Sequence, residues 1–396
     1  MSKILKTTIL VAAGVAFTLA SCSEDETIAK VSTNPGERQE IEFTLDMMSR
    51  ATDRTITNLD TIWVYADDGA AEVFPATAFI KNEYGYFKPK TKIYWPDDKE
   101  NVNFTAFWPS PDKLSEDPCG KCTDPMPGIN FAPGSTSINA EAAEYPTGMF
   151  DLLTATKQMS KEDYKGTIAL NFTHAFSQVD IKVKQGATAD HKVEIYGYNL
   201  VHKAYKSNYS FTDDSWTFTR SVESNLMDVP DEVITVGEEP VSILSTENQI
   251  YLAPATWNFK RFDLKKALDT HECYLMLYAK VYDENDELIF PTEADKDVKF
   301  ADVTLTRVPD EKVIGQYKDL RDISDCGVMF IQLGKDNLET QAGTKYVFNI
   351  DFTFGAGYYS DQDPNAPFGP ILKNPICAEV TVEDWTSTEL DDMEQN

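Results

Sequence analysis

Apolar and polar residues alternate along much of the chain after residue 40. In the first such stretch, polar residues separate Ile41, Phe43, Leu45 and Met47. Successive side chains of a β-strand point to opposite faces, so this alternation predicts a strand with one buried face. Apolar or alternating runs predict further strands at residues 61–66, 102–108, 168–172, 193–200, 249–252, 274–282, 303–306, 346–354 and 378–385.

Helical patterns are weak throughout the chain. No apolar pattern with a 3.6-residue period persists beyond about two turns. Clusters of turn-forming residues separate the strand-like runs at fairly regular spacing, which is typical of β-sandwiches. We therefore predict an all-β fold with Greek-key-type connections, in which helix is a minor component.

The alternation changes phase once, near the middle of the chain. Apolar residues occupy even positions from Ile168 to Phe176 and odd positions from Val179 to Val183. One unbroken strand cannot keep the same buried face through such a slip, so residues 175–178 must contain a bulge or a break. We place a domain boundary in this region. The predicted units are an N-terminal β-sandwich domain at 38–166, a C-terminal one at 167–386 and an acidic tail at 387–396.

Residues 1–21 have the pattern of a secretory signal peptide. Two lysines precede an apolar run that is too short to span a bilayer, which needs about 20 residues. The next residue is Cys22, and its Leu-Ala-Ser-Cys context resembles the lipobox of bacterial lipoproteins. The acidic cluster that follows is similar to a signal for export to the outer face of the cell. We expect lipid on Cys22 and a tether over 22–37; the alternative is an ordinary cleaved signal with an incidental cysteine.

Charge and size further narrow the class of protein to which this chain can belong. The chain has 396 residues, more than one hydrophobic core usually serves, and 42% of them are hydrophobic. Its formal net charge is −29. A protein this acidic repels nucleic acid and anionic membranes, so we expect no nucleic-acid partner.

The cysteine pattern predicts one local disulfide. With Cys22 assigned to lipid, five cysteines remain, and an odd number leaves at least one free or paired between molecules. Cys119 and Cys122 lie in a loop rich in Pro, Gly and Asp, without a second CxxC pair. This context favours a disulfide within the loop over a zinc or thioredoxin-type site. Cys273 is in phase with the apolar residues of its strand, so we expect it to be buried.

Residues with catalytic or ligand-binding potential are sparse. The four histidines show no metal-ligand spacing, and His174 is expected to fix backbone or a strand junction by hydrogen bonding. Gly355 and Gly357 form a lone GxG between strands, which argues against nucleotide binding. Residues 361–365 begin like a calcium loop but lack its sixth-position glycine and late glutamate; a polar turn is the default and calcium the alternative. We predict no enzyme activity, no cofactor and no metal.

Several short motifs occur in an order that resembles a known family. They are Ser-Arg-Ala-Thr at 49–52, Asn-Leu-Asp-Thr-Ile-Trp-Val-Tyr at 58–65, Tyr-Trp-Pro at 94–96 with Val-Asn-Phe-Thr-Ala-Phe at 102–107, Asp-Leu-Leu-Thr-Ala at 151–155, Leu-Asn-Phe-Thr-His-Ala-Phe at 170–176 and Val-Thr-Val-Glu-Asp-Trp at 380–385. Together with the lipobox, they resemble the fimbrillin family of surface lipoproteins. The resemblance implies two tandem transthyretin-like β-sandwich domains and a role as a subunit of a fimbria (pilus), with other fimbrial subunits as partners.

The resemblance also implies an assembly mechanism, in which a precursor is cut after an arginine near its first strand and subunits join by strand exchange. Here a cut between Arg50 and Ala51 would remove the lipid together with the strand formed by Ile41, Phe43, Leu45 and Met47. The exposed backbone groups and apolar slot would accept a strand from a neighbour. Such a contact does not close on itself, so it builds a filament. Arg54 is a nearby alternative, and Arg50 could equally be an ordinary surface residue.

Two segments of the sequence are candidates for the donated strand. The tail after residue 386 is short, acidic and barely apolar. A donor within the C-terminal domain is the stretch with Ala378, Val380 and Val382. If neither serves, the protein is an anchor or tip component that keeps its lipid.

A surface glycan-binding lipoprotein is the main alternative function. Exposed aromatic rings would stack on sugars, and the candidates are Tyr358 and Tyr359 or Trp216 and Trp257, each of which could instead be a packing residue. The host or bacterial surface ligand of an adhesive fimbria cannot be inferred from the sequence.

Overall fold

The computed structural model describes only part of the chain. The described residues are 38–45, 58–110, 130–131, 137–140, 151–211, 215–228, 230, 232–244, 250–257, 273–292, 326–334, 336–359, 369–372, 374 and 376–385. All of them belong to the compact unit Arg38–Asn396. Their regular secondary structure is β-strand throughout, so the fold is all-β, as the alternation predicts.

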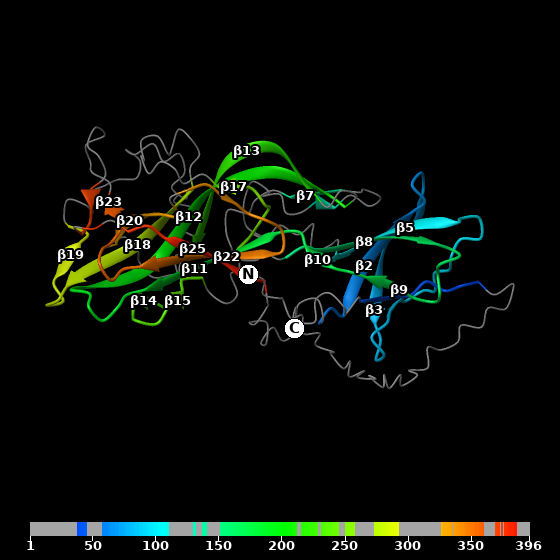
Figure 1. The fold of residues 1–396 in the computed structure, drawn as a ribbon, viewed down its shortest axis with the longest axis horizontal. Coiled ribbons are helices and arrows are strands. Elements are labelled where there is room, and N and C mark those ends of the chain that lie inside the picture. The colour runs from blue at the N-terminus through cyan, green and yellow to red at the C-terminus, as the bar shows by residue number, and fades with distance from the viewer. Residues whose placement is uncertain are drawn as a thin grey trace, which may run out of the picture. The chain divides into compact units, whose positions relative to one another are not determined.

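The first sheet has eight strands in the order β10-β8-β5-β2-β3-β4-β1-β9 (Figure 1). Its strands are β1 (Phe43–Leu45), β2 (Thr61–Asp67), β3 (Glu72–Lys81), β4 (Phe87–Pro89), β5 (Asn101–Trp108), β8 (Leu153–Ser160), β9 (Ile168–Leu170) and β10 (Thr173–His174). All pairings are antiparallel except β1 with β9, which is parallel.

This sheet curls over its own core. Phe43 on β1 lies 5.4 Å from Phe104 on β5, measured between ring centroids, although three strands separate β1 from β5 in the sheet. Inward side chains from both ends of the sheet therefore fill one apolar cluster, which includes Ile62, Phe87 and Leu170. The alternation seen in the sequence selects these side chains, because every second residue of a strand faces the same side.

The rest of the described chain forms a second sandwich, built from a five-stranded and a ten-stranded sheet. The five-stranded sheet contains β11 (Ser177–Lys184), β15 (Val241–Ser242), β16 (Ile250–Leu252), β22 (Thr344–Asp351) and β25 (Glu379–Asp384). The ten-stranded sheet contains β6 (Asn130–Phe131), β7 (Ser137–Ala140), β12 (His191–Ser210), β13 (Ser215–Asp228), β14 (Ile234–Thr235), β18 (Tyr274–Asp283), β19 (Leu288–Phe290), β20 (Gly327–Gln332), β23 (Tyr358–Tyr359) and β24 (Gly369–Pro370). A separate pair is formed by β17 (Thr256–Trp257) and β21 (Leu338–Glu339).

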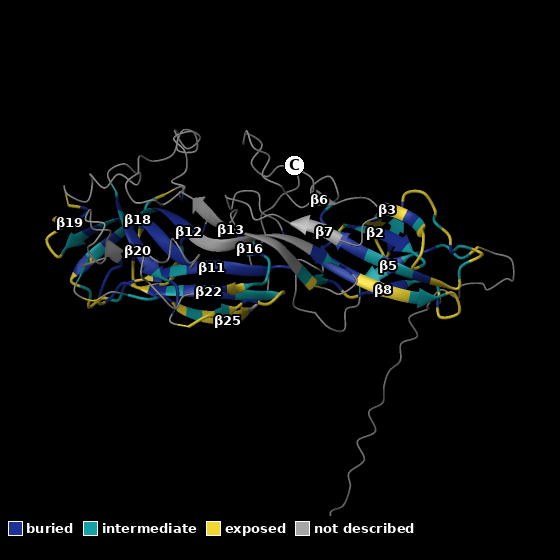
Figure 2. Ribbon diagram, turned by 90° about the horizontal axis from the view of Figure 1, so that it is seen from above, coloured by how far each residue is buried: buried dark blue, intermediate teal, exposed yellow. Residues whose placement is uncertain are grey.

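Side chains from both sheets of this sandwich meet in one core. Ile181 on β11 and Phe348 on β22 belong to the same buried cluster as Ile195 on β12 and Leu277 on β18. Figure 2 shows β11 and β18 largely buried, whereas β25 carries exposed residues along its length. Cys273 is buried in this core, which confirms its predicted role as a small apolar residue.

The predicted break near residues 175–178 is confirmed. His174 on β10 pairs with Leu153 in the first sheet, and Ser177 on β11 pairs with Leu252 in the five-stranded sheet. The chain passes from one sheet to the other across Ala175 and Phe176. The first sheet thus extends beyond residue 166, the predicted domain limit, because β9 and β10 still pair with strands of that sheet.

Most predicted strands correspond to observed strands, with shifts at their ends. The strand predicted at 346–354 ends at Asp351, whose carboxylate accepts a hydrogen bond from the Thr353 amide at 2.9 Å and so turns the chain. The strand predicted at 193–200 is longer, as β12 spans His191–Ser210. The strand predicted at 303–306 lies outside the described residues.

Candidate functional site

The first strand is held between two neighbours in the first sheet. Phe43 on β1 pairs with Phe87 on β4 and with Ile168 on β9. Further backbone hydrogen bonds extend this contact on both sides. Ile41 donates its amide to the Ile93 carbonyl at 2.8 Å, and Ile168 donates to the Glu42 carbonyl at 2.9 Å. The segment from Gln39 to Leu45, which ends in β1 and which we call the first strand, therefore lies between two flanking segments. Its loss would leave backbone donors and acceptors unpaired on both of them.

The apolar face of this strand fills the core of the first sheet. Ile41 and Phe43 are fully buried, and Leu45 packs against the same cluster. The Phe43 ring meets the Phe79 ring edge-on at a centroid distance of 4.9 Å. The predicted inward face is thus confirmed for these three residues, while Met47 lies outside the described part of the chain.

Tyr164 binds the backbone of the segment that leads into β1. Its hydroxyl hydrogen-bonds to the Glu40 carbonyl and lies 3.3 Å from the Glu42 amide, which donates to it. Its ring stacks on Trp95 with centroids 5.4 Å apart. Burial raises the pKa of the Tyr164 phenol above its ordinary value. Nothing in the sequence pattern around Tyr164 indicates this role.

Two ion pairs hold the polar face of the first strand. Lys88 Nζ lies 2.6 Å from Glu42 Oε1, and Lys92 Nζ lies 2.7 Å from Glu40 Oε2. The hydrogen bond from Lys92 to Glu40 raises the pKa of the lysine. Each glutamate side chain is less exposed than its lysine partner. The strand is therefore bonded through its backbone, its apolar face and its charged face.

The last strand, β25, is an edge strand of the five-stranded sheet. It pairs with β22 on one side over six residue pairs, from Thr344 with Asp384 to Asn349 with Glu379. Ala378 is buried and Val380 half-buried, but Val382 is 64% exposed. The middle of β25 thus contributes little to the core, whereas Ala378 directly before the strand and Trp385 directly after it are buried.

Trp385, directly after β25, is held between two other rings. The His174 ring lies parallel to it at a centroid distance of 4.0 Å, and Tyr251 stacks on it at 5.6 Å. His174 Nδ1 is hydrogen-bonded to the buried Asp151 carboxylate. His174 is thus hydrogen-bonded, as expected, but to the side chain of Asp151, and its contact with the end of β25 is ring stacking on Trp385. The other carboxylate oxygen of Asp151, Oδ1, is buried and has no hydrogen-bond partner among the residues that the structure describes.

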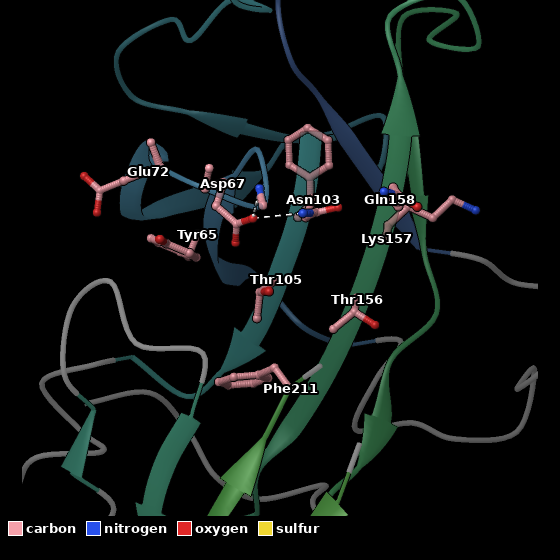
Figure 3. Close-up of a pocket in the computed structure, with 13 residues that line it drawn as sticks. Tyr65, Asp67, Glu72, Asn103, Thr105, Thr156, Lys157, Gln158 and Phe211 are labelled. Carbon is pink, nitrogen blue, oxygen red and sulfur yellow. Dashed lines mark hydrogen bonds between the residues drawn. The ribbon is translucent and has the colours of Figure 1, made fainter. Parts of the chain in front are cut away.

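A surface groove of about 760 Å³ lies along β2, β5 and β8 (Figure 3). Polar side chains line it together with apolar groups, and Phe211, which follows β12, lies at one end. The Asp67 carboxylate in the groove accepts hydrogen bonds from Asn103 Nδ2 and the Gly69 amide, both at 2.8 Å. Burial, with the nearby charges of Asp67 and Glu72, raises the pKa of the Tyr65 phenol. The groove offers hydroxyl, amide and carboxylate groups.

Comparison with known proteins identifies the family. A family model described as fimbrillin-like matches residues 49–385. The chain belongs to the fimbrillin-like family. Fimbrium subunit Fim1C of Phocaeicola vulgatus is 26% identical over 226 residues, which cover 50% of this chain and 59% of that protein, less than two thirds of its length. A solved structure of a fimbrial protein from Bacteroides vulgatus is similar at 17% identity and a TM-score of 0.46, over 88% of this chain and 100% of the other.

Several predicted sites of this fimbrillin-like chain lie outside the described residues. They are the lipidation site Cys22, the cleavage site at Arg50 and Ala51, the disulfide between Cys119 and Cys122, and the calcium-like turn at 361–365. Trp257 and Trp216, considered as sugar-stacking residues, are packing residues: Trp257 is buried against Phe348, and Trp216 stacks on Phe176. The side chains of Tyr358 and Tyr359 are not described.

The described part of the fimbrillin-like chain contains neither a metal-binding cluster nor a membrane-spanning helix. No group of three or more His, Cys, Asp or Glu side chains is placed there to hold a metal ion. Within the same residues, no helix has the length and apolar character required to cross a membrane.

Proposed function

We propose that this chain is a subunit or accessory component of a cell-surface fimbria that contributes to adhesion. Its assembly would begin with an arginine-specific cut after Arg50, followed by exchange of the first strand for a strand from another subunit. Membership of the fimbrillin-like family supports the fimbrial role. Lipid on Cys22 would hold the precursor, or an uncut anchor or tip component, at the outer membrane.

The position of β1 is the observation that carries the exchange mechanism. Phe43 is fully buried and its strand lies between β4 and β9, yet Arg50 follows Phe43 by only seven residues. A cut at Arg50 leaves β1 attached to the body of the protein by hydrogen bonds, ion pairs and packing alone. Departure of β1 opens a groove that combines unpaired backbone groups with an apolar floor, which is the geometry that recruits a foreign strand.

For the donor we propose residues 378–384 of a second copy, which comprise Ala378 and the strand β25 with Val380 and Val382. Within the described residues β25 pairs only with β22, the preceding Ala378 amide donates to the Gln332 carbonyl at 2.8 Å, and the central residues of β25 bury little apolar surface. Withdrawing β25 therefore costs less than withdrawing a central strand such as β22. Trp385 would have to leave its position between His174 and Tyr251 in the same step.

Limited digestion tests this proposal. Residues 23–396, made without lipid, would be treated with an arginine-specific protease, and mass spectrometry would locate the cut. Unboiled SDS gels and negative-stain microscopy would follow assembly. A single cut after Arg50, with ladders or fibres appearing only afterwards, is the expected result. An Arg50→Gln variant should stay uncut and monomeric. Resistance of the natural chain at Arg50, or a cut product that stays monomeric, would contradict polymerisation and favour an anchor or tip component.

Binding of a surface glycan is the second candidate, and the groove of Figure 3 is the observation in its favour. Polar side chains such as Thr105 and Gln158 can exchange hydrogen bonds with a neutral sugar. A screen against neutral oligosaccharides with the natural chain and a Thr105→Val/Gln158→Leu variant tests this role. Binding that survives in the variant would exclude the groove.

A further inference from the structure

The charges that surround the first strand are unevenly distributed for so acidic a chain. The formal net charge is −29, yet residues 81–92 contain four lysines and one acid. The described segment that lies beside them, 39–45, contains two acids and no basic residue. Lys88 and Lys92 from the first segment bind Glu42 and Glu40 from the second.

The spacing of these ion pairs follows from strand geometry. Glu40 and Glu42 are two residues apart, so both lie on the same face of the strand, opposite to Ile41 and Phe43. The hydrogen bonds of the Tyr164 hydroxyl to the backbone at Glu40 and Glu42 hold this part of the strand in register. The two lysines therefore meet carboxylates at two fixed positions along the groove.

Loss of the segment 39–45 would leave Lys88 and Lys92 without these carboxylates, in a stretch of sequence that also contains Lys81 and Lys90. An incoming strand with neutral outward residues restores the backbone bonds but not the ion pairs. A strand with basic outward residues places like charges together, which opposes binding. Both effects favour an acidic strand.

We propose that Lys88 and Lys92 select the strand that replaces β1, accepting one in which apolar inward residues alternate with outward carboxylates, and that β25 of a second copy of this chain is that strand. This inference rests on the strand exchange of the proposed function. It adds the chemistry by which the groove distinguishes one donor from another.

The residues of β25 share the alternation of the first strand, but the two glutamates of β25 are four residues apart, so in any one register only one of them can take the place of Glu40 or Glu42. Glu379, Thr381 and Glu383 lie on one face of the strand, and Val380 and Val382 lie on the other. The corresponding alternation in the first strand is Glu40, Glu42 and Thr44 against Ile41, Phe43 and Leu45. The valines are smaller than Phe43 and fill less of the core, so the outward charges account for a larger share of the recognition.

A peptide exchange experiment tests the selection on the full chain. Residues 23–396 would carry a site for a sequence-specific protease in place of the residues around Arg50, so that one defined cut frees the first strand. Three labelled peptides would compete for the groove: 378–385 as it stands, the same peptide with Glu379→Gln and Glu383→Gln, and the same with both glutamates changed to lysine. A peptide of residues 39–47 is the positive control. Fluorescence anisotropy would give affinities at low and high salt.

We expect the natural 378–385 peptide to bind about three- to tenfold more tightly than the glutamine peptide at low salt, and the difference to shrink as salt is added. With Lys88→Glu and Lys92→Glu in the protein, the lysine peptide should become the preferred ligand. Lys90→Glu, which makes the same charge change in the same segment, should keep the natural preference. Circular dichroism of each uncut variant checks folding.

The possible failures are distinguishable. If the 39–47 peptide binds and the three 378–385 peptides bind equally, exchange stands and the charge selection is overturned. If 39–47 binds and no 378–385 peptide does, β25 is not the donor and that part of the inference falls. If no peptide binds a cut chain that remains folded, the strand exchange of the proposed function fails, and the selection fails with it.

Discussion

The rings of His174 and Trp385 lie nearly parallel, with an interplanar angle of 14°. His174 ends the last strand of the first sheet, and Trp385 follows the last strand of the five-stranded sheet. Trp385 belongs to a cluster of buried residues that also contains Phe107 from β5 and Tyr209 from β12. This contact thus ties the end of β25 to the first sheet, and any process that withdraws β25 must also break it.

Substitution of Trp385 should destabilise the protein far more than substitution of a neighbour on the same strand. Trp385→Ala removes a ring that is 8% exposed and packed on two sides, so we expect a loss of about 3–5 kcal/mol in the free energy of unfolding. Val382→Ala, at a residue that is 64% exposed, should change it by less than about 0.5 kcal/mol. Urea unfolding of both variants measures the difference, and equal effects would contradict the role assigned to Trp385.

Phe43 should contribute more to stability than any outward residue of its strand. Phe43→Ala leaves a cavity between Phe79 and Phe104, so we expect a cost of about 3–5 kcal/mol. Thr44→Ala, on the outward face, is the matched control and should cost less than about 1 kcal/mol. The test is again urea unfolding of the uncut chain. A small effect of Phe43→Ala would mean that the first strand contributes little to the core, and strand exchange would lose its apolar driving force.

The Tyr164 hydroxyl should slow the opening of the first strand. Tyr164→Phe keeps the ring on Trp95 but removes the hydrogen bonds to the backbone at Glu40 and Glu42, which we expect to cost about 1 kcal/mol. Hydrogen exchange of the Glu42 amide should accelerate in this variant, since that amide loses its acceptor. Tyr84→Phe, at a residue that is 76% exposed, should leave the exchange rate unchanged. Equal rates in natural and Tyr164→Phe chains would show that the hydroxyl does not retain the strand.

Period-two patterns predicted the parts of this fold that depend on one face being buried. The inward residues Ile41 and Phe43, the break at Ala175 and Phe176, and the burial of Cys273 all follow from the alternation. The pairing partners of each strand cannot be predicted from the alternation, because it shows which face of a strand is buried and not which segment covers that face. The parallel pairing of β1 with β9, for example, joins segments more than 120 residues apart, as the contact between Glu42 and Tyr164 also does.

The two glycines at 355 and 357 illustrate another limit of the sequence. As a lone GxG they argued only against a nucleotide site, and the structure gives them a packing role. A Cβ at Gly355 would collide with the Asn374 carbonyl, and one at Gly357 with the Phe330 carbonyl. Both positions therefore need glycine for close approach of two backbone segments. Such a need is invisible until the neighbouring segments are known.

The ion pair of Asp68 and Lys99 should make the free energy of unfolding depend on pH in the acidic range. Lys99 Nζ lies 2.6 Å from the Asp68 carboxylate, which also accepts hydrogen bonds from the amides of Ala71 and Ala70. The bond to Lys99, followed by those to the amides, holds the pKa of Asp68 well below its ordinary value of 3.8. A carboxyl group whose pKa is lower in the folded chain stabilises that chain above its ordinary pKa, and this contribution is lost as the pH falls towards the folded value.

We therefore expect Asp68→Asn to lower the free energy of unfolding at neutral pH and to have a progressively smaller effect below about pH 4, where the unfolded chain becomes protonated at this residue. Asp98→Asn is the control, since Asp98 is 77% exposed and lies 3.6 Å from the same lysine. Urea unfolding of the natural chain and both variants between neutral pH and about pH 3 gives the comparison. A difference between Asp68→Asn and the natural chain that stays constant across this range would mean that the side chain acts through its shape and not through its charge.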